Sequence, residues 1–254
     1  MSEQNPNFYL ARVALVAQPT QNALRAYSAV TGTWASLTVP VDTGDTFLLG
    51  GNTALVAQPV QNVLRAFSAI TGTWASLGVA VDTGDTFLVD TSVALVAQPT
   101  QNALRGFSAH TGAWTSLVVA VDTGDTFRVG GNIALVAQPT QNALRAFSAI
   151  TGGPWDSLVV PVDTGDTFLV GTNVALVAQP TQNELRAYSA VTGTWASLGV
   201  AVDTGDTFLV GGNTAFVAQP TRNALRAFSA ITGAWTSLTV PVDPGDLFLV
   251  GSDA

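Results

Sequence analysis

A short motif that contains one tryptophan recurs at a nearly constant spacing along the whole chain. Successive tryptophans are 40, 40, 41, 40 and 40 residues apart, and the motif accounts for every tryptophan in the sequence. A fixed period of this length is the signature of a repeat architecture, in which each unit buries its apolar surface against its neighbours. The period runs unbroken from Val13, so we expect one repeat domain over residues 1–254. Its repeats begin near residues 13, 53, 93, 133, 174 and 214.

Each repeat divides into four short apolar segments separated by turn residues. In the second repeat the segments are 47–51, 54–58, 63–70 and 74–81, with glycine, proline, asparagine or aspartate between them. Such segments indicate strands, because a helix usually needs about ten to twelve residues. Four strands in about 40 residues are typical of a β-propeller blade. The pattern therefore predicts an all-β fold, a six-bladed β-propeller with four antiparallel strands per blade.

The two ends of the chain predict how this ring closes. Segment 7–11 aligns with 47–51, but Asn7 stands where the other copies have phenylalanine, and segment 247–251 carries another copy. The C-terminal segment is the better copy, so we expect it to complete the first blade and to close the ring by pairing the N- and C-terminal strands. A closed ring hides its strand edges, which favours a monomer.

Composition excludes several classes of function. The net charge is −8, and the nine basic residues are all arginine and form no cluster, so we expect neither nucleic acid nor membrane partners. No apolar run approaches the roughly 20 residues of a membrane-spanning helix. The start of the sequence lacks a signal-peptide pattern, which leaves a cytoplasmic location as the default expectation.

Catalysis is not expected from this set of side chains. The chain has no cysteine, no lysine and one histidine, His110, at a position that is valine or isoleucine in the other repeats. Nucleophile–base pairs and imidazole metal sites are hard to build from these residues. We therefore predict a protein that is not an enzyme and that holds neither a metal nor another cofactor.

A double glycine, an aromatic residue, a threonine and a tryptophan recur at fixed offsets, as Gly50–Gly51, Phe67, Thr71 and Trp74 do in the second repeat. In this pattern the chain resembles the kelch repeat family. The resemblance implies a propeller that serves as a protein-interaction scaffold, with the double glycine at the end of the second strand of each blade. The segment count instead places the glycines after the first strand, and Ser68 stands where kelch repeats usually have aspartate. The two arguments therefore leave open which strand of the blade the double glycine follows.

Two further resemblances concern smaller motifs. The order of strand, arginine, aromatic residue and tryptophan is similar to that of compact β-propeller lectins. The segment 42–47, Asp-Thr-Gly-Asp-Thr-Phe, is similar to the Asp-box of sialidase-like propellers, which is a structural hairpin. In such a hairpin we expect the first aspartate to accept backbone N–H groups while the glycine takes a positive φ. Two carboxylates in four residues are too few ligands for Ca²⁺.

The arginines and tryptophans of the repeat are the candidate binding residues. By strand alternation each arginine shares a face with the aromatic residue two positions later. One interpretation is structural: an arginine between blades stacks on an aromatic ring and pairs with an aspartate. The other is a sugar site in each groove between blades. The candidates are Trp34, Trp74, Trp114, Trp155, Trp195, Trp235, Arg25, Arg65, Arg105, Arg145, Arg186 and Arg226.

These observations lead to one main hypothesis and two alternatives. The main hypothesis is a non-enzymatic binding protein that recognises carbohydrates through six near-equivalent sites, with weak single sites amplified by avidity. The first alternative is a kelch-like scaffold that binds a protein partner. The second is an engineered or recently amplified repeat without a specific ligand. Near-identical repeats argue against a sialidase-like enzyme, because catalysis needs different residues from different blades.

Overall fold

The computed structural model describes residues 11–243 and 245–251 of the chain. These residues form 23 β-strands and four short 3₁₀ helices, which confirms the all-β class. In the same residues there is no helix of the length and apolarity needed to cross a membrane.

The strands form six antiparallel sheets, one for each repeat, and we number them 1 to 6 in chain order. Sheet 1 has three strands in the described part of the chain, and the others have four. Sheet 1 contains β1 (Val13–Gln18), β2 (Ala23–Ser28) and β3 (Thr33–Thr38), and sheet 2 contains β4 (Thr46–Leu49), β5 (Thr53–Gln58), β6 (Val63–Ser68) and β7 (Thr73–Gly78). Sheet 3 contains β8 (Thr86–Val89), β9 (Val93–Gln98), β10 (Ala103–Ser108) and β11 (Ala113–Val118), and sheet 4 contains β12 (Thr126–Gly130), β13 (Ile133–Gln138), β14 (Ala143–Ser148) and β15 (Asp156–Val159). Sheet 5 contains β16 (Thr167–Val170), β17 (Val174–Gln179), β18 (Glu184–Ser189) and β19 (Thr194–Gly199), and sheet 6 contains β20 (Thr207–Gly211), β21 (Thr214–Gln219), β22 (Ala224–Ser229) and β23 (Ala234–Thr239). The 3₁₀ helices are η1 (Pro19–Gln21), η2 (Pro99–Gln101), η3 (Pro139–Gln141) and η4 (Pro220–Arg222).

The sheet order shows which strand of each sheet the double glycine follows. Gly50 and Gly51 lie between β4 and β5, the first and second strands of sheet 2. This agrees with the segment count and differs from the kelch arrangement, in which the glycines end the second strand. The close approach of the next sheet explains the glycine: a side chain at Gly50 would collide with the backbone of Asp90 in sheet 3.

Two polar residues shape the turns inside each sheet. After β1 in sheet 1 and after the equivalent strand of every other sheet, an asparagine adopts a left-handed conformation. Asn22 and its five equivalents have φ between 47° and 53°. Asparagine tolerates this region better than most residues. After the third strand, Ser68 Oγ accepts the Thr71 N–H at 3.0 Å and donates to Ala109 O of the next sheet at 2.5 Å. A serine here therefore both caps a turn and joins two sheets.

The core is a series of interfaces between successive sheets, because both faces of each inner sheet are apolar. Between sheets 2 and 3, Leu64 and Ala66 pack against Val96 and Phe107, and all four side chains are fully buried. The positions opposite the aromatic ring are small because the sheets approach closely. At Gly106 even a Cβ atom would lie 2.7 Å from the ring of Phe147.

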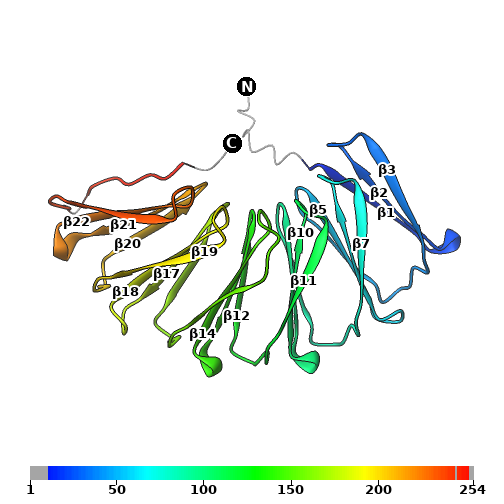
Figure 1. Ribbon diagram of the computed structural model, residues 1–254, viewed down its shortest axis with the longest axis horizontal. Coiled ribbons are helices and arrows are strands. Elements are labelled where there is room, and N and C mark those ends of the chain that lie inside the picture. The colour runs from blue at the N-terminus through cyan, green and yellow to red at the C-terminus, as the bar shows by residue number, and fades with distance from the viewer. Residues whose placement is uncertain (1–10, 244, 252–254) are drawn as a thin grey trace.

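The six sheets stand side by side in chain order along an open arc, with sheets 1 and 6 at its opposite ends (Figure 1). Backbone hydrogen bonds connect neighbouring sheets at one end of their strands, as from Asn52 N–H to Thr91 O at 2.6 Å and from Ser92 N–H to Gly131 O at 2.9 Å. These bonds hold that end of every sheet at a short, regular spacing.

The predicted closure of the ring is not present in the described residues. Residues 247–250 belong to no strand, and residues 7–10 of the predicted N-terminal strand lie outside the described part of the chain. Neighbouring sheets contact each other at the first as well as the fourth strand, for example β4 with β8 and β3 with β7. Contacts between successive sheets therefore extend from one edge of each sheet to the other.

Candidate functional site

The predicted arginines lie in a polar ladder that crosses each sheet. In sheet 2, Arg65 Nε donates to Gln58 Oε1 at 2.6 Å, and Arg65 Nη1 donates to Ser76 Oγ at 2.7 Å. Gln58 Nε2 in turn donates to Asp45 Oδ2 and to Pro40 O, both at 2.8 Å. The ladder thus ties the segment before β4 to the other three strands of the sheet.

The glutamine at the centre of the ladder is the residue whose role the sequence did not predict. It is fully buried in sheets 2 to 6, although it ends an otherwise apolar strand. Its recurrence in all six repeats was the available signal, since a buried amide must find hydrogen-bond partners. The same arginine Nε to glutamine Oε1 bond joins Arg25 to Gln18, Arg105 to Gln98, Arg145 to Gln138, Arg186 to Gln179 and Arg226 to Gln219.

Burial and charge have opposite effects on the pKa of Arg65 in this ladder. Burial lowers the pKa of Arg65, and the nearby Asp45 carboxylate partly offsets this effect. Arginine still keeps its proton in proteins, so the ladder holds a cation and an anion bridged by an amide. The expected direct pairing of arginine with aspartate is therefore wrong for the ladder. The ion pair found among the described residues joins Arg222 to Asp203 at 3.4 Å, outside it.

The tryptophans pack between sheets. The Trp74 ring lies 5.4 Å from the Phe67 ring at a tilt of 53°, and its indole N–H donates to Ala35 O of sheet 1 at 3.3 Å. Trp114 and Trp235 make the same contact with the preceding sheet. Contacts of this kind are typical of a packing residue.

The exposed fraction of the tryptophan side chain differs between sheets. Trp34 in sheet 1 is 58% exposed, because no sheet precedes it in the described chain. At the other extreme, Trp155 is 8% exposed. The extra residue at Gly153–Pro154 makes β15 begin after this tryptophan, and its indole N–H is buried without a partner.

Strand register brings the two candidate sets together in every sheet that follows the regular pattern. In sheet 2, Arg65 is paired with Ser76 and Phe67 with Trp74, so arginine and tryptophan lie two positions apart on neighbouring strands. The structure therefore brings the two predicted sets close together within each sheet. The arginines bond to glutamine and serine of their own sheet, not to aspartate as the structural interpretation expected, whereas the tryptophans also contact the preceding sheet.

The aspartate turns connect one sheet to the next. The second aspartate, not the first as predicted, accepts the backbone hydrogen bond: Asp42 N–H donates to Asp45 Oδ2 at 3.1 Å. The reason is that Asp45 points back across the turn and also receives the Gln58 amide. The expected positive glycine φ is present at Gly84, at 109°, and in the equivalent turns at Gly124, Gly205 and Gly245, but not at Gly44 or Gly165. Within the described residues, no group of three or more histidine, cysteine, aspartate or glutamate side chains could hold a metal ion.

His110 lies beside a row of asparagines at the turns that precede the second strands. Its Nε2 is 3.1 Å from Asn132 Oδ1. Asn132 Nδ2 donates to Asn173 Oδ1 at 2.6 Å, and Asn173 Nδ2 donates to Asn213 Oδ1 at 2.8 Å. The histidine thus extends a row of hydrogen-bonded side chains at these turns.

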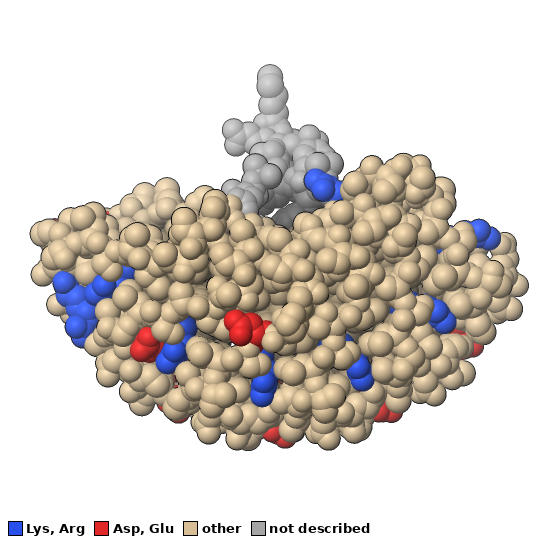
Figure 2. Space-filling model, viewed as in Figure 1, with Lys and Arg blue, Asp and Glu red and all other residues tan. Residues whose placement is uncertain are grey.

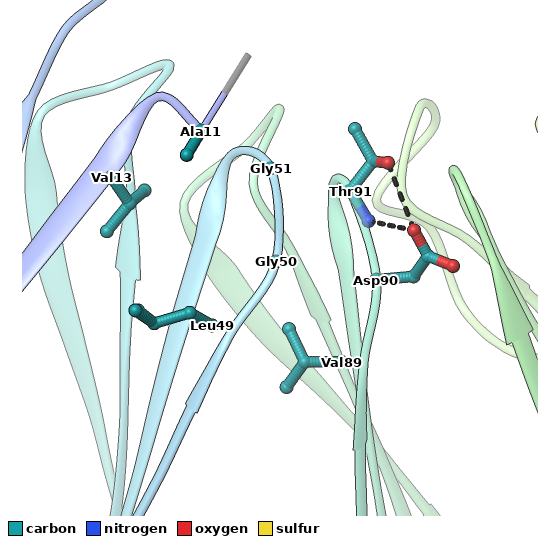
Figure 3. A pocket seen from close by; sticks show the side chains of 8 residues that line it. All are labelled: Ala11, Val13, Leu49, Gly50, Gly51, Val89, Asp90 and Thr91. Atoms are coloured by element: carbon teal, nitrogen blue, oxygen red, sulfur yellow. Dashed lines mark hydrogen bonds between the residues drawn. The ribbon is translucent and has the colours of Figure 1, made fainter. Parts of the chain in front are cut away.

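A cavity of about 420 Å³ lies between the turns of sheets 2 and 3 and the start of β1 (Figure 3). Its walls are mainly apolar, with Leu49 and Val89 on neighbouring strands. The carboxylate of Asp90 turns toward its own neighbour, since Oδ1 accepts the Thr91 N–H at 2.5 Å and the Thr91 hydroxyl at 3.0 Å. None of the predicted arginines or tryptophans lines this cavity.

The fourth strand of each sheet is an open edge. In sheet 2, Val79 N–H donates to Asn62 O. Alternation then directs the backbone groups of Leu77 and Ala75 toward β6 and leaves those of Trp74, Ser76 and Gly78 facing outward. The residues of β7 carry no charge, and in sheet 3 the outward-facing Val118 is 85% exposed.

No protein-family model and no curated protein sequence matches this chain. Among solved structures, the chain is similar to Hsv2 of Kluyveromyces marxianus, with a TM-score of 0.36, 10% identity and coverage of 94% of this chain and 84% of that one. It is also similar to the computationally designed Ika8 protein, with a TM-score of 0.33, 11% identity and coverage of 90% and 72%. A functionally unknown protein from Desulfotomaculum acetoxidans gives a TM-score of 0.35, 12% identity and coverage of 91% and 81%. TM-scores below 0.5 carry no argument about function, so the conclusions below rest on the molecule's own geometry.

Proposed function

We propose that the protein is a non-catalytic scaffold that binds protein segments in extended conformation along the open edges of its sheets. The observation that carries this proposal is the row of uncharged fourth strands. Natural proteins usually protect such edges with charged residues, proline or bulges, because unpaired backbone groups recruit further strands. Addition of a strand to an exposed edge is an established mode of peptide recognition.

The edges are alike in five sheets and different in one. Strands β3, β7, β11, β19 and β23 are six residues long and contain no charged residue. Strand β15 has four residues, begins with Asp156 and follows Pro154. Its edge is therefore protected in the usual way, and we expect it to bind a strand least well.

The surrounding surface suits an uncharged partner. Figure 2 shows basic side chains at intervals across this face, with a few acidic side chains among them and uncharged residues over the rest. Each arginine of the ladder is held by glutamine and serine of its own sheet, so its side chain is less free to reach toward a partner. Backbone hydrogen bonds would give affinity, and the side chains that flank the edge would give selectivity.

Substituting lysine at one outward-facing position in each of three edges tests this proposal. The variant Gly78→Lys/Val118→Lys/Gly199→Lys adds charge to β7, β11 and β19, and the control Thr83→Lys/Thr123→Lys/Thr204→Lys adds the same charge in the exposed aspartate turns. Peptides selected from a random twelve-residue phage library should bind the wild type and the control equally and the edge variant at least about tenfold more weakly, because charged edges oppose strand addition. Selected peptides that bind the edge variant as well as the control would contradict the proposal.

The carbohydrate hypothesis makes a different prediction. Six equivalent sites require a stoichiometry of about six sugars per chain in a calorimetric titration, in line with the six Trp–Arg pairs. The packing of the tryptophans weighs against carbohydrate binding, because Trp34 is the one tryptophan whose side chain is largely exposed, at 58%. A glycan array with strong hits, retained by the edge-lysine variant, would favour carbohydrate binding instead.

A further inference from the structure

The two ends of the arc expose faces that are buried everywhere else in the molecule. On sheet 1 the first end face consists of Ala14, Val16 and Tyr27. Val16 is 37% exposed, whereas the equivalent valines in sheets 2 to 5, such as Val56 and Val96, are fully buried. On sheet 6 the last end face consists of Phe216, Leu225 and Ala227, all partly exposed. Each end thus presents an apolar sheet face without a neighbouring sheet.

The two end faces are complementary to each other because the repeat makes them so. Between sheets 2 and 3, Leu55, Leu64 and Ala66 pack against Ala94, Val96 and Phe107. Leu55, Leu64 and Ala66 are equivalent to the residues of the last end face, Phe216, Leu225 and Ala227. Likewise, Ala94, Val96 and Phe107 are equivalent to Ala14, Val16 and Tyr27 of the first end face. Five such interfaces are formed between the six sheets, so a contact between the end faces would be a sixth copy of an established interface.

The C-terminal segment has the sequence of a first strand, which sheet 1 does not contain within the described residues. Residues 246–251 lie against sheet 6 where the first strand of a following sheet would lie. The Phe248 ring is 5.5 Å from the Phe216 ring, and a Cβ at Gly211 would be 2.6 Å from Gly251 O. Leu247 and Leu249 are 80% and 83% exposed, and no strand pairs with them. In the part of the chain that the structure describes, sheet 1 thus has three strands, and the strand-like sequence 247–250 at the opposite end of the arc is unpaired.

We propose that sheet 1 of a second copy of this chain docks on the last end face and pairs through β1 with residues 247–250. The occupant is a second copy because sheets 1 and 6 of one chain lie at opposite ends of the open arc (Figure 1). The contact joins two different faces, so it is a head-to-tail contact that either closes into a ring of chains or continues as a filament. This inference concerns the end faces alone and does not depend on the edge-strand proposal.

The internal repeats define the register of the new pair. In sheet 2, Thr46 is opposite Ala57, Phe47 is opposite Val56 and Leu48 is opposite Leu55. By the same alignment Leu247 lies opposite Ala17 of the second copy, Phe248 opposite Val16 and Leu249 opposite Leu15. Opposed residues in antiparallel strands have Cα atoms about 4.5–5.5 Å apart, which a disulfide can span.

Disulfide cross-linking tests both the partner and the register, since the chain has no cysteine of its own. A mixture of the single variants Ala17→Cys and Leu247→Cys, oxidised and run without reductant, should give a covalent dimer at twice the chain mass of 26.1 kDa. The internal pair Thr46→Cys/Ala57→Cys is the positive control, because its two residues are opposed within sheet 2. The double variant Ala17→Cys/Leu247→Cys should form covalent oligomers. Cross-linking within single chains alone, which would mean closure of the ring, overturns the proposal, as does no cross-link when the control pair reacts.

Light scattering gives a second readout on the protein without cysteines. The unmodified chain should have a concentration-dependent mass above 26.1 kDa, and Leu249→Lys should return it to 26.1 kDa because a lysine would be buried in the new sheet. The control Val60→Lys places the same charge at a side chain that is 72% exposed in a turn, and it should leave the assembly intact. A mass of 26.1 kDa for the unmodified chain at all concentrations contradicts the proposal.

Discussion

Replacing Phe107 by alanine is expected to lower the free energy of unfolding by about 3–5 kcal/mol, the largest effect that we expect from a single substitution. The side chain is fully buried between sheets 2 and 3 and lies 5.3 Å from the Trp114 ring. Its removal leaves a cavity in an interface that can collapse little, because backbone hydrogen bonds hold the sheets at a regular spacing. Urea unfolding followed by tryptophan fluorescence measures the change.

The matched control for this variant is Tyr27→Ala, at the equivalent position of sheet 1. Tyr27 also packs on a tryptophan of its own sheet, at 5.3 Å, but it faces the end of the arc. In the monomeric chain we expect Tyr27→Ala to lower the free energy of unfolding by about 1 kcal/mol, since the substitution removes less buried area. If both variants destabilised the monomeric chain equally, the face of sheet 1 that holds Tyr27 would have to be buried as fully as the face of sheet 3 that holds Phe107.

Replacing Gln138 by methionine is expected to cost about 2–4 kcal/mol, although the two side chains have similar size. Gln138 is fully buried, accepts from Arg145 Nε at 2.5 Å and donates to Asp125 Oδ2 at 2.7 Å and to Ala120 O at 2.8 Å. Methionine removes all three bonds and leaves the partly buried arginine and aspartate without their bridge. Chemical unfolding at neutral pH measures the loss.

Gln18→Met provides the comparison within the same chain. Gln18 is partly exposed, and in the described residues its side chain bonds only to Arg25, at 2.6 Å. Water can replace that contact, so we expect a cost below about 1 kcal/mol. A similar cost at both positions would mean that packing around the glutamine, and not the polar ladder, determines its contribution.

The candidate site could be predicted only in part, because sequence alone does not show how a side chain uses its contacts. The positions of Arg65 and Trp74 were visible from the period, and strand alternation placed each arginine on a face with an aromatic residue. That Gln58 links Arg65 to Asp45 was not visible, because the three residues come from different segments of the repeat. The ring of Trp74 could serve packing or a ligand until the contact with Ala35 of the preceding sheet was known.

The sequence by itself determined the all-β class, the number of repeats and the four strands of each one. These features follow from local signals, such as short apolar runs, the turn at Asn62 and the glycine at Gly84, which act within a few residues. Only the tertiary structure decided the phase of the sheets, the roles of the arginines and tryptophans, and the open arc in place of a closed ring. Those features depend on the angle and spacing between sheets whose residues are about 40 positions apart. The spacing is maintained by contacts such as Ser68 with Ala109 and Asn52 with Thr91, which no single repeat contains.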